Sequence, residues 1–189
     1  SKESEETKKM YGLDNSATEE YGRRCLIARR LVERGVRFVQ LFLNGQPWDT
    51  HDKNAERLKG LCAKTDQPSA ALVKDLKQRG LLDSTVVLWT GEFGRLPISQ
   101  GKDGRDHNRH AFSLWVAGGG FKRGLVYGAT DDFGYASVEN VIPVCDFHAT
   151  LLDTLGLDHR TLTFQHEGRA TSLTDPDVTD AKVVKELLA

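Results

Sequence analysis

The chain has 189 residues, of which 39% are hydrophobic and 28% are charged, a composition typical of a folded globular protein. Its 26 basic and 27 acidic residues give a net charge of −1 and are well mixed, so we expect no nucleic-acid partner. No uninterrupted apolar stretch reaches membrane-spanning length, so no membrane span is predicted. The length suits one domain, and we predict a single α/β domain over residues 1–189.

The first half of the chain predicts helices around one buried strand. Residues 18–34 show the spacing of an amphipathic helix, which Gly35 would end. Residues 36–43 form an apolar run typical of a strand buried on both faces in a parallel sheet. A helix is expected over residues 54–62, with Asp52 as its N-cap. A further helix would begin at Asp66, with Pro68 in its first turn, and end near residue 80.

The second half predicts more strands and a closing helix. Strands are expected over residues 85–90 and 112–117, the latter ended by three glycines, with a short strand at 125–127. Residues 94–111 form a long polar loop of a length that is often functional. A helix over 146–155 and a short one near 181–188 follow. This alternating order favours a parallel sheet with right-handed crossovers.

The first residues of the chain and its cysteines give two further predictions. The first residues, Ser1 to Glu6, contain neither an initiator Met nor the apolar core of an export signal, so we expect a piece of a longer protein. The three cysteines are odd in number and widely spaced, which predicts buried thiols rather than a disulfide framework.

Polar clusters follow two of the predicted strands. Asp49 and His51 come shortly after residues 36–43, and Glu92 and Arg95 come directly after residues 85–90. In open α/β sheets ligands bind just beyond the carboxyl ends of the strands. The sequence therefore predicts a functional site at these loops.

Carboxylate and imidazole groups in these loops suit a divalent metal ion. Asp49 and His51 are one residue apart on a loop and could turn to one zinc, manganese or iron ion. The alternative is a loop in which Asp49 caps a turn and His51 is exposed. His107 and His110 lie three apart, and we expect one of them as a ligand and the other behind it. Solvated surface histidines are the alternative.

Glu92 and Arg95 have acid–base and anion-binding chemistry. Glu92 at a glycine-flanked turn is suited to act as a ligand or a general acid or base, and Arg95 as an anion clamp. The alternative is a structural Glu–Arg pair that braces the loop. No Gly-x-Ser-x-Gly elbow is present and no Cys stands beside a His. A hydrolase of this sequence would therefore use metal-bound water, or a nucleophile on another segment.

Motifs along nearly the whole chain resemble a large bacterial family of unknown function that is often labelled sulfatase-like. The motifs that carry this resemblance are residues 21–22 and 28–36, Trp48-Asp49-Thr50-His51-Asp52, Gly91-Glu92-Phe93-Gly94-Arg95, Gly104-Arg105-Asp106-His107-Asn108, residues 117–120 and 128–131, and Asp146-Phe147-His148-Ala149-Thr150. That family looks like a branch of the alkaline phosphatase superfamily, which includes sulfatases and phosphomutases.

The resemblance implies a fold, a location and partners. The fold would be the C-terminal portion of a three-layer α/β/α sandwich with a mostly parallel, alkaline phosphatase-like sheet. The protein would be periplasmic or exported, its substrate a small-molecule or polysaccharide ester, and its second partner the N-terminal part of the same protein. That part would hold the remaining ligands and any nucleophile, so this chain alone is expected to be inactive.

The resemblance also implies a metal site. Asp49, His51, Glu92 and His107 (or His110) would bind a divalent metal, with zinc, manganese or calcium as candidates. Phe93 stands where many members of the superfamily have His or Asn, so a second metal site would be incomplete.

Two functions are consistent with these features. The leading hypothesis is a metal-dependent hydrolase of sulfate or phosphate esters, in which Arg95 or Arg105 holds the anion and Glu92 takes part in catalysis. The alternative is a non-catalytic metal- or ligand-binding module of an exported protein, which the phenylalanine at position 93 favours.

Overall fold

The computed structural model of the chain describes residues 3–189. Ser1 and Lys2, where the predicted internal start lies, are outside the described residues. Contacts between Cα atoms group the chain into two compact units, the first reaching Gly118 and the second running from Gly119 to Ala189. Each unit is described by itself.

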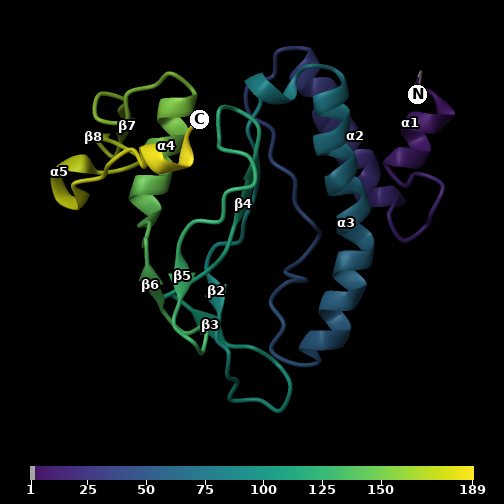
Figure 1. Cartoon of the computed structure of the whole chain (residues 1–189), viewed down its shortest axis with the longest axis horizontal. Coiled ribbons are helices and arrows are strands. Elements are labelled where there is room, and N and C mark those ends of the chain that lie inside the picture. The colour runs from purple at the N-terminus through teal and green to yellow at the C-terminus, as the bar shows by residue number, and fades with distance from the viewer. Residues whose placement is uncertain (1–2) are drawn as a thin grey trace. The chain divides into compact units, whose positions relative to one another are not determined.

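Three helices pack together in the first unit: α1 (Glu5–Met10), α2 (Glu19–Glu33) and α3 (Asn54–Gln78) (Figure 1). The predicted helix over residues 18–34 is confirmed by α2. Ser4 caps α1, because its hydroxyl accepts a hydrogen bond from the backbone N–H of Thr7 at 3.1 Å. Tyr11, Cys25, Leu26 and Ala71 form the buried core between these helices.

Glycines follow the two long helices of the first unit, α2 and α3, as the sequence predicts. Gly35 has φ +82°, and its N–H donates to the carbonyl of Val32 while the next N–H donates to Leu31. Gly80 repeats this pattern at the end of α3 with φ +69°. Both ends are Schellman motifs, in which a left-handed residue without a Cβ satisfies the last free carbonyls of a helix.

The prediction of two helices separated at Asp66 is wrong, because α3 runs without interruption from Asn54 to Gln78 and contains Pro68. Proline removes one backbone hydrogen bond inside a helix. The helix nevertheless continues because Pro68 and the neighbouring Thr65 are buried on the side that packs in the core. Thr65 also bonds back to the carbonyl of Leu61 at 3.0 Å. Burial of this face outweighs the local preference of proline.

A buried ion pair joins the three helices. Arg29 of α2, with a side chain 2% exposed, donates from Nε to Oδ2 of Asp75 on α3 at 2.8 Å. The same carboxylate accepts from Tyr11 at 3.0 Å and from Arg79 at 2.7 Å. Arg29 also pairs with Glu33. Because every charge in this group has a partner of opposite sign, its burial is tolerated.

The predicted strand over residues 36–43 is wrong. This segment has no regular secondary structure and no strand partner in the described part of the chain. Leu41 packs against the helical core, whereas Phe38 and Phe42 are 79% and 65% exposed. The segment therefore contacts the helices through Leu41, while Phe38 and Phe42 face solvent.

The predicted three-layer α/β/α sandwich with a parallel, alkaline phosphatase-like sheet is wrong. The strands form separate antiparallel pairs of two. In the first unit, β1 (Val87–Trp89) pairs with β4 (Trp115–Ala117), and β2 (Gly94–Arg95) pairs with β3 (His107–Asn108). A short 3₁₀ turn, Leu82–Ser84, precedes β1. Thus the strands predicted at 85–90 and 112–117 exist in shorter form, but they pair with each other in opposite directions.

The second unit contains two hairpins and helix α4. The hairpins are β5 (Ala129–Thr130) with β6 (Ser137–Glu139), and β7 (Phe164–His166) with β8 (Arg169–Thr171). Helix α4 (Val144–Thr154) confirms the predicted helix over 146–155, and Gly156 ends it with φ +72°. The short elements α5 (Pro176–Thr179) and a 3₁₀ turn (Lys185–Leu187) follow.

The remaining predictions for the second unit are wrong. No strand forms at 125–127, and only a three-residue 3₁₀ turn lies within residues 181–188. The tail is held to α4 by side-chain acceptors instead. Asp146 accepts from the N–H of Lys182 at 3.2 Å, and the hydroxyl of Thr150 accepts from the N–H of Val184 at 2.9 Å. Within residues 3–189, no helix combines the length and the apolar composition needed to cross a bilayer.

Replacing Arg29 by alanine should lower the free energy of unfolding by about 3 kcal/mol, because it leaves part of the Asp75 charge buried without compensation. Urea unfolding followed by circular dichroism measures this loss. The matched control is Arg23→Ala on the same helix, where the ion pair with Glu19 is exposed and should contribute less than about 1 kcal/mol. Equal losses in the two variants would contradict a dominant role for the buried pair.

Candidate metal centre

Three side chains from two parts of the first unit bring their ligand atoms together. Asp49 and His51 lie on the loop before α3, and His107 lies on β3. The Oδ1 atom of Asp49 is 3.0 Å from Nε2 of His51 and 3.0 Å from Nε2 of His107. The two Nε2 atoms are 3.3 Å apart. Among the His, Cys, Asp and Glu side chains of residues 3–189, these form the one group of three that could hold a metal ion.

These separations match the spacing of ligands around one ion. Zinc binds imidazole nitrogen and carboxylate oxygen at about 2.0–2.2 Å, so neighbouring ligands of a tetrahedral site lie about 3.3–3.6 Å apart. Ligands at right angles around an octahedral ion would lie about 3 Å apart at the same bond lengths. Both histidine side chains are 50% exposed and Asp49 is 29% exposed. An ion could therefore reach all three groups and keep positions open to solvent.

The β2–β3 ladder holds one side of the site. Arg95 stands directly opposite His107 in this ladder, and its Nη1 donates to Oδ1 of Asp49 at 2.5 Å. Gly94 is required beside it, because a Cβ at that position would lie 1.8 Å from the carbonyl oxygen of Ala111. Arg95 therefore ties the Asp49 loop to the strand that carries His107.

Hydrogen bonds from His107 and from Arg95 lower the pKa of the Asp49 carboxyl to about 2. The group is consequently a carboxylate at neutral pH, which is the form that binds metal ions.

Phe93 packs against the imidazole of His107 on β3. Its ring centroid lies 4.4 Å from that of His107, and the guanidinium carbon of Arg95 lies 5.6 Å from the same phenyl ring. The phenyl ring thus limits the orientation of the imidazole.

The loop of residues 96–106 holds the other side of the site. The N–H of Arg105 donates to the carbonyl of Thr50 at 2.9 Å. Asp103 caps α3, since its backbone oxygen accepts from Asn54 and its Oδ1 accepts from Lys53, each at 3.0 Å. The predicted capping by Asp52 is therefore wrong, because Lys53 occupies the N-cap position. Asp52 pairs with Arg57 instead.

The other predicted site residues lie around the three ligands. Glu92 is 67% exposed, and its Oε1 lies 3.7 Å from Nη2 of Arg95, so it contacts the group that holds Asp49. The backbone N–H of His110 donates to the side chain of Asn108, and neither Glu92 nor His110 belongs to the converging group among the described residues. Arg105 is half-buried and donates to the carbonyl of Gly104 at 2.6 Å.

Asp106 also contacts the site, although no pattern in the sequence predicts this contact. Its Oδ1 lies 3.4 Å from Nδ1 of His51, on the opposite side of the ring from Nε2. The sequence shows the Asp-His pair at 106–107, but the partner of the aspartate is 55 residues away.

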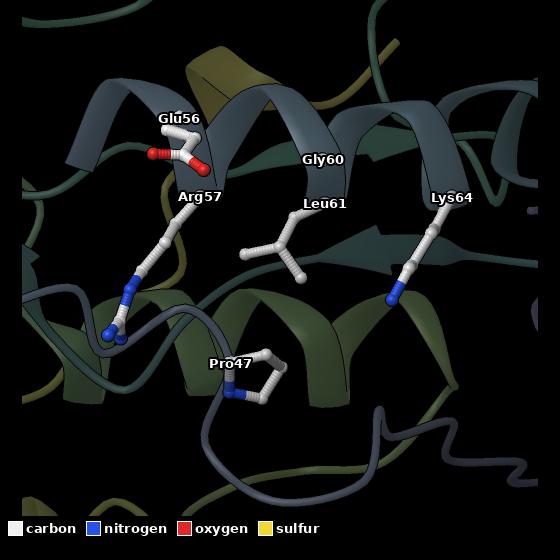
Figure 2. A pocket seen from close by; sticks show the side chains of 6 residues that line it. All are labelled: Pro47, Glu56, Arg57, Gly60, Leu61 and Lys64. Atoms are coloured by element: carbon white, nitrogen blue, oxygen red, sulfur yellow. The ribbon is translucent and has the colours of Figure 1, made fainter. Parts of the chain in front are cut away.

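Two hollows lie along α3, and neither contains the ligands. One is lined by Pro47 and by residues of the first turns of α3, and Figure 2 shows Pro47 facing Leu61 between the side chains of Arg57 and Lys64. The other is lined by the three tryptophans, Trp48, Trp89 and Trp115, opposite α3. Trp48 and Trp89 meet edge to face with centroids 5.7 Å apart. Trp48 directly precedes Asp49, so this aromatic contact also anchors the loop that carries Asp49 and His51 (the ligand loop).

Replacing Gly104 by alanine should disturb the centre, since its Cβ would lie 1.9 Å from the backbone oxygen of His51. We expect a loss of about 1–3 kcal/mol in the free energy of unfolding, as for other overpacked sites. Thermal unfolding measures the change. Gly60→Ala is the control, because that glycine lies within α3 with nothing within 4 Å of a new Cβ. It should leave stability unchanged or raise it by about 1 kcal/mol. A neutral Gly104→Ala variant would show that the loop contact is dispensable.

Comparison with known proteins corrects the predicted resemblance. No curated protein matches the chain, and no solved structure matches it. Nothing found points to a sulfatase-like family or to the alkaline phosphatase superfamily, so that assignment is overturned, and the implied exported location stays a prediction. One family model does match, over residues 1–188, and it carries the description "Protein of unknown function (DUF1501)". The chain belongs to this family.

Proposed function

We propose that the chain provides the divalent-metal centre of a hydrolase that acts on phosphate or sulfate esters. The observation that carries this proposal is the convergence of Asp49, His51 and His107, whose ligand atoms all lie within 4.8 Å of one another. Two imidazoles and one carboxylate form a donor set that binds catalytic metals while leaving positions for water and substrate.

The donor set favours zinc or manganese over calcium. Imidazole nitrogen binds zinc well, whereas calcium takes six to eight oxygen ligands. Only Asp49 supplies oxygen among the three ligands. We therefore retain zinc and manganese from the predicted ions and place calcium last.

Hydrolysis follows from the chemistry that such an ion supplies. A divalent ion held by Asp49, His51 and His107 would supply Lewis-acid chemistry, since it would lower the pKa of a water molecule there and polarise the ester oxygen. Glu92, which is exposed and tethered through Arg95, is our proposed base for the proton of this water.

Arg105 is the better anion-binding group of the two predicted arginines. Arg95 already donates to Asp49 and lies beside Glu92, so its charge is compensated within the site. Arg105 is held in place by a bond to a neutral carbonyl, which leaves its positive charge for an anionic ester. This assignment supports an ester with a negative charge as the substrate class.

The metal centre is tested by titrating the apo protein with zinc in competition with a chromophoric chelator. We expect one ion per chain, with the Kd raised more than about 100-fold in His51→Ala and His107→Ala, because even the loss of a group that only supports a ligand costs 10–100-fold. His166→Ala is the control, since that exposed histidine lies on β7 in the other unit. Equal zinc affinity in all variants would rule the centre out.

The hydrolytic function is tested with 4-nitrophenyl phosphate and 4-nitrophenyl sulfate, using the protein at its full natural length with zinc or manganese. Turnover should be lost in His51→Ala, and kcat/KM should fall about 10-fold or more in Arg105→Ala. Arg109→Ala serves as the matched control, because that arginine is exposed in the same segment. Metal binding without turnover of either ester would favour the alternative, a non-catalytic metal-binding module.

A further inference from the structure

We propose that Asp106 is a positioning residue that fixes the imidazole of His51 for metal binding through Nε2. This inference rests on the proposed metal centre and adds a fourth residue to it. The carboxylate does not reach the converging ligand atoms among the described residues. It contacts the opposite nitrogen of the ring, Nδ1, at 3.4 Å from its Oδ1.

The carboxylate of Asp106 is itself held at two points. Its second oxygen, Oδ2, accepts a hydrogen bond from the backbone N–H of Gln100 at 2.8 Å. The backbone oxygen of the same residue accepts from the N–H of Leu96 at 2.8 Å. The side chain is 27% exposed, against 50% for His51. Asp106 is thus anchored at the base of the 96–106 loop, and one oxygen remains for the imidazole.

The consequence for His51 follows from the chemistry of its ring. A neutral imidazole carries one N–H, and only the other nitrogen can bind a metal ion. An anionic acceptor beside Nδ1 favours the proton at that atom, which leaves the lone pair of Nε2 directed at Asp49 and His107. Carboxylate–histidine–metal arrangements of this kind orient the ring and raise its basicity.

This arrangement also explains why the loop lies so close to His51. The absence of a Cβ at Gly104 lets the loop backbone contact the carbonyl of His51, and the next residues bring Asp106 beside the ring. The loop could instead serve only to brace the start of α3, which Asp103 does through Lys53 and Asn54. The two roles are separable, because Asp103 contacts Lys53 and Asn54 at the start of the helix, whereas Asp106 contacts the ring of His51 and the N–H of Gln100.

The test compares Asp106→Asn with Asp103→Asn in the full chain by zinc titration. The asparagine at 106 keeps the shape and can still accept from Gln100, but it removes the negative charge beside Nδ1. We expect the Kd for zinc to rise 10–100-fold in Asp106→Asn. In Asp103→Asn it should stay within about twofold of wild type, since that change leaves the ring contact in place.

A second readout follows the proton itself. In the zinc-loaded protein, Nδ1–H of His51 should give a downfield, exchange-protected resonance in proton–nitrogen NMR spectra, identified by its loss in His51→Ala. Asp106→Asn should shift this resonance upfield or broaden it, while Asp103→Asn leaves it unchanged. A brace without a positioning role would not move this signal.

The outcomes separate this inference from the proposed function. If wild type binds zinc and His51→Ala does not, but Asp106→Asn keeps the wild-type Kd and resonance, the positioning role is overturned and the metal centre stands. If both aspartate variants weaken zinc binding equally, the loop acts only as a brace, and the inference is likewise overturned. If wild type itself binds no zinc, the proposed function and this inference both fail.

Discussion

The buried ion pair between Arg29 and Asp75 is the constraint on which the first unit depends. Breaking it would leave a charge in the interior, so α2 and α3 must keep the register in which Arg29 meets Asp75. Helix α3 has 25 residues and spans about 37 Å, and its opposite end, Asn54, directly follows the ligand loop. Packing near Asp75 therefore fixes the position of Asn54, where the loop with Asp49 and His51 joins the helix. The rigid helix carries this constraint over a distance too long for direct contact between Asp75 and the loop.

The candidate centre needs a second support, because a loop fixed at one end still moves. The short ladder of β2 and β3 supplies it by placing Arg95 opposite His107, with the guanidinium turned to Asp49. The 96–106 connection between these strands then returns to bond Thr50 and to cap α3. Two residues in each strand are a weak ladder by themselves. The polar contacts between Asp49, Arg95 and His107 thus support the hairpin as much as the hairpin supports them.

The sequence could predict those parts that local chemistry decides. Helix α2, the glycine ends at Gly35 and Gly80, and the grouping of Asp49 with His51 all follow from neighbouring residues. The direction in which strands pair depends on contacts between distant segments, so the parallel sheet was predicted from element order and was wrong. The prediction likewise divided α3 into two helices near Pro68, because the burial of Pro68 in the core cannot be read from its neighbours in the sequence. Of the predicted ligands, Glu92 and His110 stand outside the converging group among the described residues, because Glu92 precedes β2 and His110 follows the end of β3.

The candidate ligand set would link metal binding to the stability of this region. His51 and His107 are separated by 56 positions, and their Nε2 atoms face each other at 3.3 Å beside a single carboxylate oxygen. Without an ion, the two imidazole nitrogens compete for the same carboxylate oxygen of Asp49. A bound ion would instead accept one lone pair from each of the three groups and would join the helix side of the site to the hairpin side. At an ion concentration 100 times the Kd, binding to the folded state alone contributes about 2.7 kcal/mol, which is comparable to the effect of the buried ion pair. The exposed polar loops and the buried helical core would then depend on one another for a stable first unit.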